Sequence, residues 1–359
     1  MPFGHGLESL GPYREGLLGA PDQLISVERF LRDEVVGHAS PVLMVRNPRG
    51  FSFEVLLDRG LDVGWTQTPS GTIAWRSPRG FVEAARHEPE GLGWLRTFGG
   101  GLLSTCGLTS TGLPSVSAGV AHGLHGRIGH CPVDAVCWEV VGAARVEQLI
   151  RETGIVGPSP TIAAGEWIRV IGEVVESGLG GPTLRLTRQL LARVDSPQLL
   201  VLDRVTNESW QSAGHMFRHH LNLGYPLVTA GTQVRTTARP FGTRDHGTSR
   251  IPENPWNLDL DPSATRGEEV VYCDNSECSV ASVSVLTEGG GECRIDYDPS
   301  AFPYLILWRE PSAGVNALGV EPSTSRDDGR VATAEQGDLI RLEPFESRTY
   351  WTAITYQEL

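Results

Sequence analysis

Alternation between apolar and polar residues recurs along most of the chain and predicts many short β-strands. It is clearest at residues 51–58, 167–175, 184–191, 198–205, 304–308 and 348–356. These segments are rich in β-branched and aromatic residues, and Gly, Pro, Asn or Asp bounds them, as is typical of strands. Strands at turn-separated intervals over about 300 residues predict an all-β fold, a large antiparallel sandwich.

Other segments refine this picture or leave it open. Residues 22–32 and 136–152 fit either a helix or a strand, and 287–291 predict a hairpin turn. The polar, Pro-rich segment 236–265 is expected to be a long surface loop, either an ordinary solvated loop or a lid over a site. We expect one domain over residues 1–359, with an N-terminal extension of about residues 1–40.

Composition narrows the class of protein. The 43 Gly and 24 Pro in 359 residues fit a turn-rich β fold. A formal charge of −13 argues against nucleic acid and anionic membranes as main partners. No secretory signal or membrane span is visible, and none of the six cysteines forms a CxxC pair. We therefore expect a reduced, cytoplasmic protein; a homodimer is compatible with the sequence, which does not fix the oligomeric state.

Histidine and arginine cluster near residue 122. His122 and His125 are followed by Arg127. In a strand the two histidines would face opposite sides, whereas in a helix or turn they could converge. A metal site would need a third ligand from His219, His220 or Glu321. Buried or surface histidines without a ligand are an alternative, and our leading expectation includes no metal and no cofactor.

A second cluster suits acid–base chemistry. On a strand, His220 and Asn222 share one face, and His219, which points the other way, is expected to be structural. Histidine can donate or accept a proton near neutral pH. Glu321 precedes Pro322 in an expected loop, where it is either a solvated residue or a base.

Two further side chains have equally open roles. Trp308 is either a core residue or a stacking surface for a substrate. Arg59 forms either a surface ion pair with Asp62 or a contact to a ligand.

Five stretches together resemble the aldose 1-epimerase (galactose mutarotase-like) superfamily, and in particular its branch catalogued as a domain of unknown function. They are residues 58–64, 100–108, 122–128, 220–227 and 318–324, in the expected order. The resemblance implies a β-supersandwich in which His220 is the acid and Glu321 the base of sugar-ring opening. It also implies that His125 binds the sugar, with Arg59 and Arg127 as ligands of hydroxyl or carboxylate groups.

The chain departs from the usual pattern of that superfamily in two places. His220 is followed by Leu-Asn-Leu, where typical mutarotases carry Asn-His-x-Tyr-Phe-Asn. Their Leu-His-Gly-Gly becomes Leu-His-Gly-Arg, ending at Arg127. A cation at that position predicts an acidic or oxidised sugar rather than a neutral hexose.

Three functions remain open from the sequence, all with a small carbohydrate as partner. The leading one is a sugar-active isomerase, most simply an aldose 1-epimerase. The second is a keto-sugar epimerase or lyase, in which Glu321 abstracts a proton beside a carbonyl and Arg127, His125 or a metal stabilises the enolate. The third is a carbohydrate-binding protein without catalysis, which needs neither His220 nor Glu321 as a proton carrier.

Overall fold

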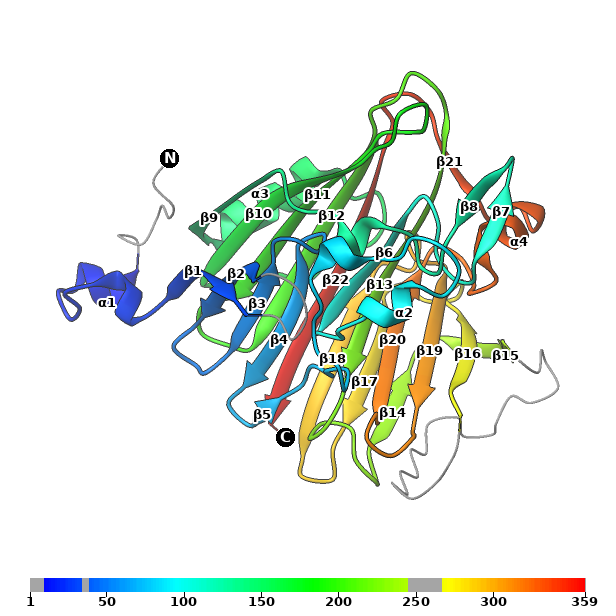
Figure 1. Ribbon diagram of the computed structural model, residues 1–359. Coiled ribbons are helices and arrows are strands. Elements are labelled where there is room, and N and C mark those ends of the chain that lie inside the picture. Colours follow the sequence, from blue (N-terminus) through cyan, green and yellow to red (C-terminus); the bar gives the residue numbers. More distant parts are fainter. Residues whose placement is uncertain (1–9, 34–38, 245–266, 359) are drawn as a thin grey trace.

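Two large antiparallel sheets form the body of the protein (Figure 1). The structure is a computed structural model, and it describes residues 10–33, 39–244 and 267–358. The 12-stranded sheet runs in the order β1 (Ser26–Arg32), β2 (Ser40–Arg46), β3 (Ser52–Leu56), β4 (Asp62–Thr68), β6 (Leu103–Leu108), β13 (Ala213–Leu223), β20 (Ala317–Ser323), β19 (Tyr304–Glu310), β16 (Glu269–Asp274) and β15 (Arg239–Thr243). Two short strands complete it, β5 (Gly71–Thr72) beside β4 and β21 (Ile340–Leu342) beside β13.

The second sheet has eight strands and covers one face of the first. Its order is β14 (Gln233–Thr236), β17 (Ala281–Leu286), β18 (Gly291–Tyr297), β22 (Ser347–Glu358), β12 (Gln198–Asn207), β11 (Leu184–Arg193), β10 (Glu166–Glu176) and β9 (Ala135–Gly142). A separate hairpin consists of β7 (Ser115–Ser117) and β8 (Val120–His122). The helices are α1 (Gly11–Arg14), α2 (Trp94–Thr97), α3 (Ala143–Thr153) and α4 (Gly329–Glu335), with 3-10 turns η2 (Pro21–Gln23), η3 (Ala84–Arg86) and η4 (Ile128–His130).

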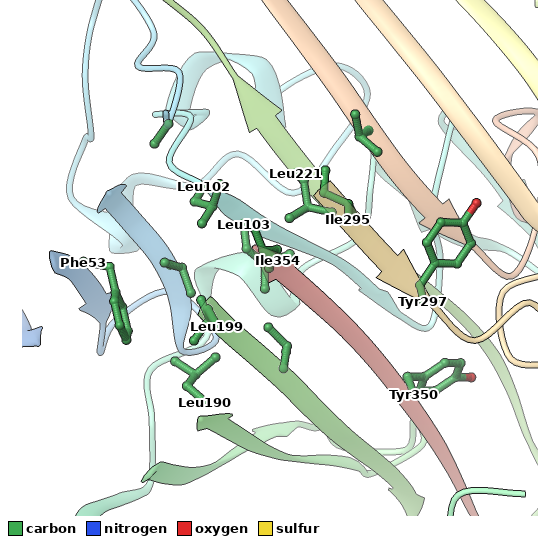
Figure 2. Close-up of a cluster of buried hydrophobic side chains, with 14 of the residues drawn as sticks. Phe53, Leu102, Leu103, Leu190, Leu199, Leu221, Ile295, Tyr297, Tyr350 and Ile354 are labelled. Carbon is green, nitrogen blue, oxygen red and sulfur yellow. The ribbon is translucent and has the colours of Figure 1, made fainter. Parts of the chain in front are cut away.

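The main core lies between the two sheets. Figure 2 shows side chains of both sheets in one cluster, including Leu103 and Leu221 from the 12-stranded sheet and Leu199 and Ile354 from the other. Since side chains alternate along a strand, each inner strand sends every second residue into this core and the others to the opposite face. This alternation explains why the repeating sequence pattern predicts the fold correctly, and the all-β sandwich expected from sequence is confirmed.

A smaller core covers the outer face of the eight-stranded sheet. Helix α3 packs Val146, Leu149 and Ile150 against Trp167 and Trp351 of that sheet. The ambiguous segment 136–152 therefore contains most of strand β9 followed by most of this helix, so both interpretations are partly right. The helix ends at Gly154 in the left-handed conformation (φ 82°), which glycine adopts without steric cost.

The other local predictions have mixed outcomes. Residues 22–32 contain the end of a 3-10 turn and strand β1, which pairs with β2, and the turn at 287–291 joins β17 to β18 as predicted. The expected loop 236–265 is wrong at its start, because Arg239–Thr243 is strand β15, with a register shift at Pro240. The remainder of that segment from residue 245 lies outside the described residues.

Glu321 is also placed differently from its prediction. It lies within strand β20, between β13 and β19, and not in a loop. Pro322, which lacks a backbone N–H, suggested a loop. The sheet accommodates it because the pairing of β20 with β13 skips the two positions between Arg218–Ser323 and Leu221–Val320.

All six cysteines are unpaired. Within the described part of the chain, no helix has the length and apolar character needed to cross a membrane.

Candidate active site

A cavity of ≈ 470 Å³ opens on the face of the 12-stranded sheet that points away from the core. Its floor is made by the outward-facing residues of β13, β20, β19 and β16, and its walls by loop residues around α2 and before η4. The described residues that line it are Leu92, Trp94, Leu95, Phe98, Leu113, Leu124, His125, Arg218, His220, Arg244, Glu268, Val270, Ile306, Trp308, Glu321 and Asp327.

Sheet register brings His220 and Glu321 together. Leu221 lies opposite Val320, so the neighbouring residues His220 and Glu321 meet across β13 and β20 on the cavity face. Nε2 of His220 and Oε1 of Glu321 are 3.2 Å apart, and both side chains are almost fully buried. Gly319 leaves room for this contact, because a Cβ there would lie 2.7 Å from Oε1 of Glu321.

Arg218 holds the other oxygen of Glu321. Its Nη1 donates to Oε2 of Glu321 at 2.9 Å and to Oδ1 of Asp327 at 2.8 Å, and its Nε donates to Oγ of Ser323 at 3.2 Å. Arg218 is fully buried, so these bonds satisfy a guanidinium that would otherwise be costly to bury. As a result, Oε1 of Glu321 is the oxygen that faces His220.

Burial shifts both members of the pair toward their uncharged forms. Removal from water lowers the pKa of His220 to about 3, and the nearby Arg218 cation adds to this shift. Burial raises the pKa of Glu321 to about 8, with Asp327 acting in the same direction and Arg218 opposing it. Both shifts favour a neutral imidazole at His220 and a protonated carboxyl at Glu321 near neutral pH, so the pair has one proton that can pass between them.

Aromatic rings surround His220. The ring centroids of Phe98, Trp308 and Trp94 lie 5.6, 5.7 and 6.2 Å from that of His220. His125 meets His220 edge-on, with the ring centroids 5.7 Å apart. These rings exclude water from the pair on several sides, which accounts for the large effect of burial on both pKa values.

The backbone of His125 explains its position in the wall. His125 has φ 58°, in the left-handed region, within the sequence Gly-Leu-His-Gly. Its Nδ1 accepts a hydrogen bond from the backbone N–H of Gly112 at 3.3 Å. Burial holds the pKa of His125 well below its usual value, with Arg218 the second cause, so its imidazole is neutral.

A second group of charges lies at the side of the cavity. Arg244 contacts Glu268 at 2.5 Å and Asp327 at 3.7 Å. The indole N–H of Trp308 donates to Glu268 at 3.0 Å, which fixes the orientation of that ring.

The structure brings together four of the eight site residues predicted from sequence: His125, His220, Trp308 and Glu321. The other four, Arg59, His122, Arg127 and Asn222, are not among the described residues that line this cavity. Arg59 is buried elsewhere, where its guanidinium donates to the carbonyl of Val82, and it lines a separate void of ≈ 10 Å³.

The remaining three candidates have structural or surface positions. His122 lies at the end of β8 and bonds to Ser117 at 2.8 Å, so it does not converge with His125. Asn222 is fully buried and donates to backbone carbonyl groups, including that of Gly101 at 3.1 Å. Arg127 is exposed at the start of η4 and does not line the cavity. The expectation of an acidic or oxidised sugar depends on Arg127, which does not line this cavity, and it stays a prediction.

His219 is structural, as expected. It faces the core side of β13 and bonds to Asp203 at 2.7 Å and to Thr352 at 2.8 Å. Among the described residues, no group of three or more His, Cys, Asp or Glu side chains is arranged to hold a metal ion.

Sequence reasoning missed several site residues. Arg218 could have been found, because it lies two positions before His220 and thus on the same face of a strand. Asp327, Arg244 and Glu268 gave no signal, because they lie outside the strands and reach the cavity only through the tertiary fold.

Comparison with known proteins agrees with this architecture. The family model described as a domain of unknown function (DUF4432) matches residues 37–164 and 156–356. No curated protein sequence matches the chain.

Three solved structures illustrate the shared fold. A candidate aldose 1-epimerase from Klebsiella pneumoniae is 22% identical, with a TM-score of 0.75 over 93% of this chain and 84% of its own. A galactose mutarotase-like protein from Clostridium acetobutylicum is 11% identical, with a TM-score of 0.59 over 94% and 100%. A galactose 1-epimerase from Lactobacillus acidophilus is 12% identical, with a TM-score of 0.55 over 93% and 99%. At these identities the likeness shows a galactose mutarotase-like β-sandwich fold.

Proposed function

Since this chain belongs to the family described as a domain of unknown function (DUF4432) and has a mutarotase-like fold, we propose that it is a sugar-active isomerase, most simply an aldose 1-epimerase. One observation carries the proposal. Nε2 of His220 and Oε1 of Glu321 lie 3.2 Å apart in a cavity, and burial favours the uncharged form of both side chains. One solved protein of this fold is described as a galactose 1-epimerase and another as a candidate aldose 1-epimerase, which supports the same assignment.

The reaction needs one proton donor and one acceptor within reach of the same hemiacetal. One group protonates the ring oxygen, the other takes the proton of the anomeric hydroxyl, and the C1–O5 bond breaks to give the open aldehyde. Rotation about C1–C2 followed by reclosure gives the other anomer, and reclosure returns both protons. Each group therefore acts once as acid and once as base, and the pair ends the cycle with the single proton it began with.

The roles implied by the resemblance, His220 as acid and Glu321 as base, fit this scheme after one proton transfer. The ground-state pair has its proton on Glu321, and transfer across the 3.2 Å contact gives imidazolium and carboxylate with the same total proton count. Arg218 stabilises the carboxylate so formed, since it already donates to Oε2. Neutral His125 and the ring of Trp308 would contact the sugar beside the pair.

The test is the rate of anomer exchange, followed by polarimetry on a panel of reducing sugars and uronic acids. Glu321→Gln keeps the shape of the side chain and its bond from Arg218 but cannot carry a proton. We expect turnover to fall by ~10²–10⁴-fold, the typical contribution of a general acid or base, while sugar binding is retained. The matched control is Glu147→Gln on the exposed face of α3, which should leave the rate unchanged.

The result also separates the alternatives. Equal rates for wild type and Glu321→Gln, on a sugar that the wild type clearly accelerates, would rule out the proposed proton carrier. Binding of sugars without acceleration of any of them would favour a carbohydrate-binding protein.

A further inference from the structure

The walls of the cavity are more aliphatic than a fully hydroxylated sugar requires. Besides its three aromatic rings, which could stack on a sugar, it is lined by four leucines, one valine and one isoleucine. Leu92 and Leu95 are each 54% exposed and Leu113 is 36% exposed, so three large aliphatic side chains face solvent around one small cavity. An exposed apolar cluster beside buried polar groups is typical of a site whose ligand covers it.

Seven polar side chains line the described part of the cavity, and most of them are already bonded to one another. Arg218 bonds to Glu321 and Asp327, and Arg244 and the indole of Trp308 bond to Glu268. Hydroxyl groups buried against leucine would lose their bonds to water without gaining new partners. A sugar with every carbon hydroxylated thus fits this lining worse than one with an unhydroxylated carbon.

We propose that the substrate class is a deoxy sugar: a reducing sugar whose hemiacetal lies at His220 and Glu321 and whose deoxygenated carbon packs against Leu92, Leu95 and Leu113. This inference rests on the proposed function and deepens it. The leucines select against the extra hydroxyl because their side chains offer it no hydrogen bond, while the methyl or methylene group gains contact with them.

Matched pairs of sugars test the inference without knowledge of the natural stereochemistry. The pairs are D-galactose with 6-deoxy-D-galactose, D-glucose with 6-deoxy-D-glucose, L-mannose with L-rhamnose and, for a methylene group in the ring, D-glucose with 2-deoxy-D-glucose. Within each pair only one hydroxyl differs, so the ratio of kcat/KM reports the preference at that carbon. In the pair that is accelerated best, we expect the deoxy sugar to be favoured by roughly 10-fold or more, the usual scale of selection by an apolar pocket.

A variant links that preference to the leucines. Leu95→Asn changes an exposed side chain and should fold, and the ratio should fall toward one. Leu179→Asn, fully exposed and outside the cavity, is the control and should leave the ratio unchanged.

The possible results are distinct. Anomer exchange with equal or lower kcat/KM for the deoxy member of every accelerated pair would overturn the inference and leave the proposed function standing. If no sugar is accelerated, the proposed function fails, and the binding of the same pairs measured by ligand-detected NMR still decides the inference. Weaker or equal binding of the deoxy members would overturn it. Tighter binding of the deoxy members, with that preference abolished by Leu95→Asn, would support it.

Discussion

The charge of Asp327 should control the pH range in which the protein is active. Asp327 and Glu321 accept hydrogen bonds from the same nitrogen of Arg218, at 2.8 and 2.9 Å. Their two bonded oxygens are thus no further apart than the sum of these distances, about 5.7 Å. A negative charge at Asp327 disfavours ionisation of Glu321 and contributes to its raised pKa of about 8.

Asp327→Asn removes this charge and keeps an oxygen that can accept from Arg218. At an effective dielectric constant of ~20, two unit charges at that separation repel by about 3 kcal/mol, or roughly two units of pKa. Part of the effect is lost to relaxation around Arg218, so we expect the pKa of Glu321 to fall by about one to two units.

The sign of the change follows from the proton count of the pair. Activity requires one proton on His220 and Glu321 together, and that proton is lost when the pH rises above the pKa of Glu321. The alkaline limb of the pH–rate profile should therefore move from about 8 in the wild type to roughly 6–7 in the variant. The acid limb, set by protonation of His220 near pH 3, should move less.

The assay is anomer exchange measured by polarimetry across this pH range, with the spontaneous rate subtracted at each pH. Asp22→Asn, at an exposed position far along the sequence, serves as the matched control and should keep the wild-type profile. An alkaline limb that stays in place or moves to higher pH in Asp327→Asn would refute the assignment of that limb to Glu321.

Three other changes have expected outcomes. Gly319→Ala would place a Cβ 2.7 Å from Oε1 of Glu321 and displace that carboxyl group. Turnover in the anomer-exchange assay should fall by on the order of 10²-fold, the usual cost of moving a catalytic group by about 1 Å. The control Gly142→Ala, whose Cβ would have no atom within 4 Å, should leave the same rate unchanged. Arg127→Ala should keep the wild-type kcat/KM within about twofold, because surface changes away from a site have small effects; a tenfold loss would return Arg127 to the site. Burial lowers the pKa of His215 to about 3, so its contribution to stability is present above its unfolded value of 6.5 and is lost as the pH falls toward 3. Below pH 4.5, the ordinary pKa of a glutamate, Glu321 is protonated in both the folded and the unfolded protein and no longer changes stability with pH. From pH 4.5 to 3 the loss of the His215 contribution should therefore lower the midpoint temperature of thermal unfolding steeply. A constant midpoint temperature over this range would contradict the prediction.

The fold could be predicted from the sequence because its physical cause is local. Side chains of each long strand point alternately to the core between the sheets and to the opposite face, and in β10 burial alternates regularly from Ile168 to Glu176. Strands β11 and β12 also contain runs of buried residues, because part of their outer face is covered by the smaller core under α3. Where one segment contains two elements, as in β9 followed by α3, a single periodicity cannot describe it, and the sequence remained ambiguous.

The site could be predicted only in part, because it depends on which distant residues the sheet register brings together. His220 and Glu321 were found through the resemblance of their motifs, and the register of β13 and β20 explains their contact. Arg127 was assigned by its position beside His125, yet neighbours in a turn point in different directions and Arg127 faces solvent. Asp327 reaches the site through Arg218, a contact between residues 109 positions apart that no local pattern reveals.

The most direct test of the central claim is NMR exchange spectroscopy of a reducing sugar in D₂O, with wild type and Glu321→Gln. Ring opening by the shared proton exchanges only protons bound to oxygen, so every carbon-bound hydrogen of the sugar is retained. The account predicts rapid exchange between the two anomers with wild-type protein, no deuterium on any carbon, and a rate lower by ~10²–10⁴-fold in the variant. Deuterium appearing at the carbon beside the carbonyl, or anomer exchange that is equally fast in Glu321→Gln, would contradict it.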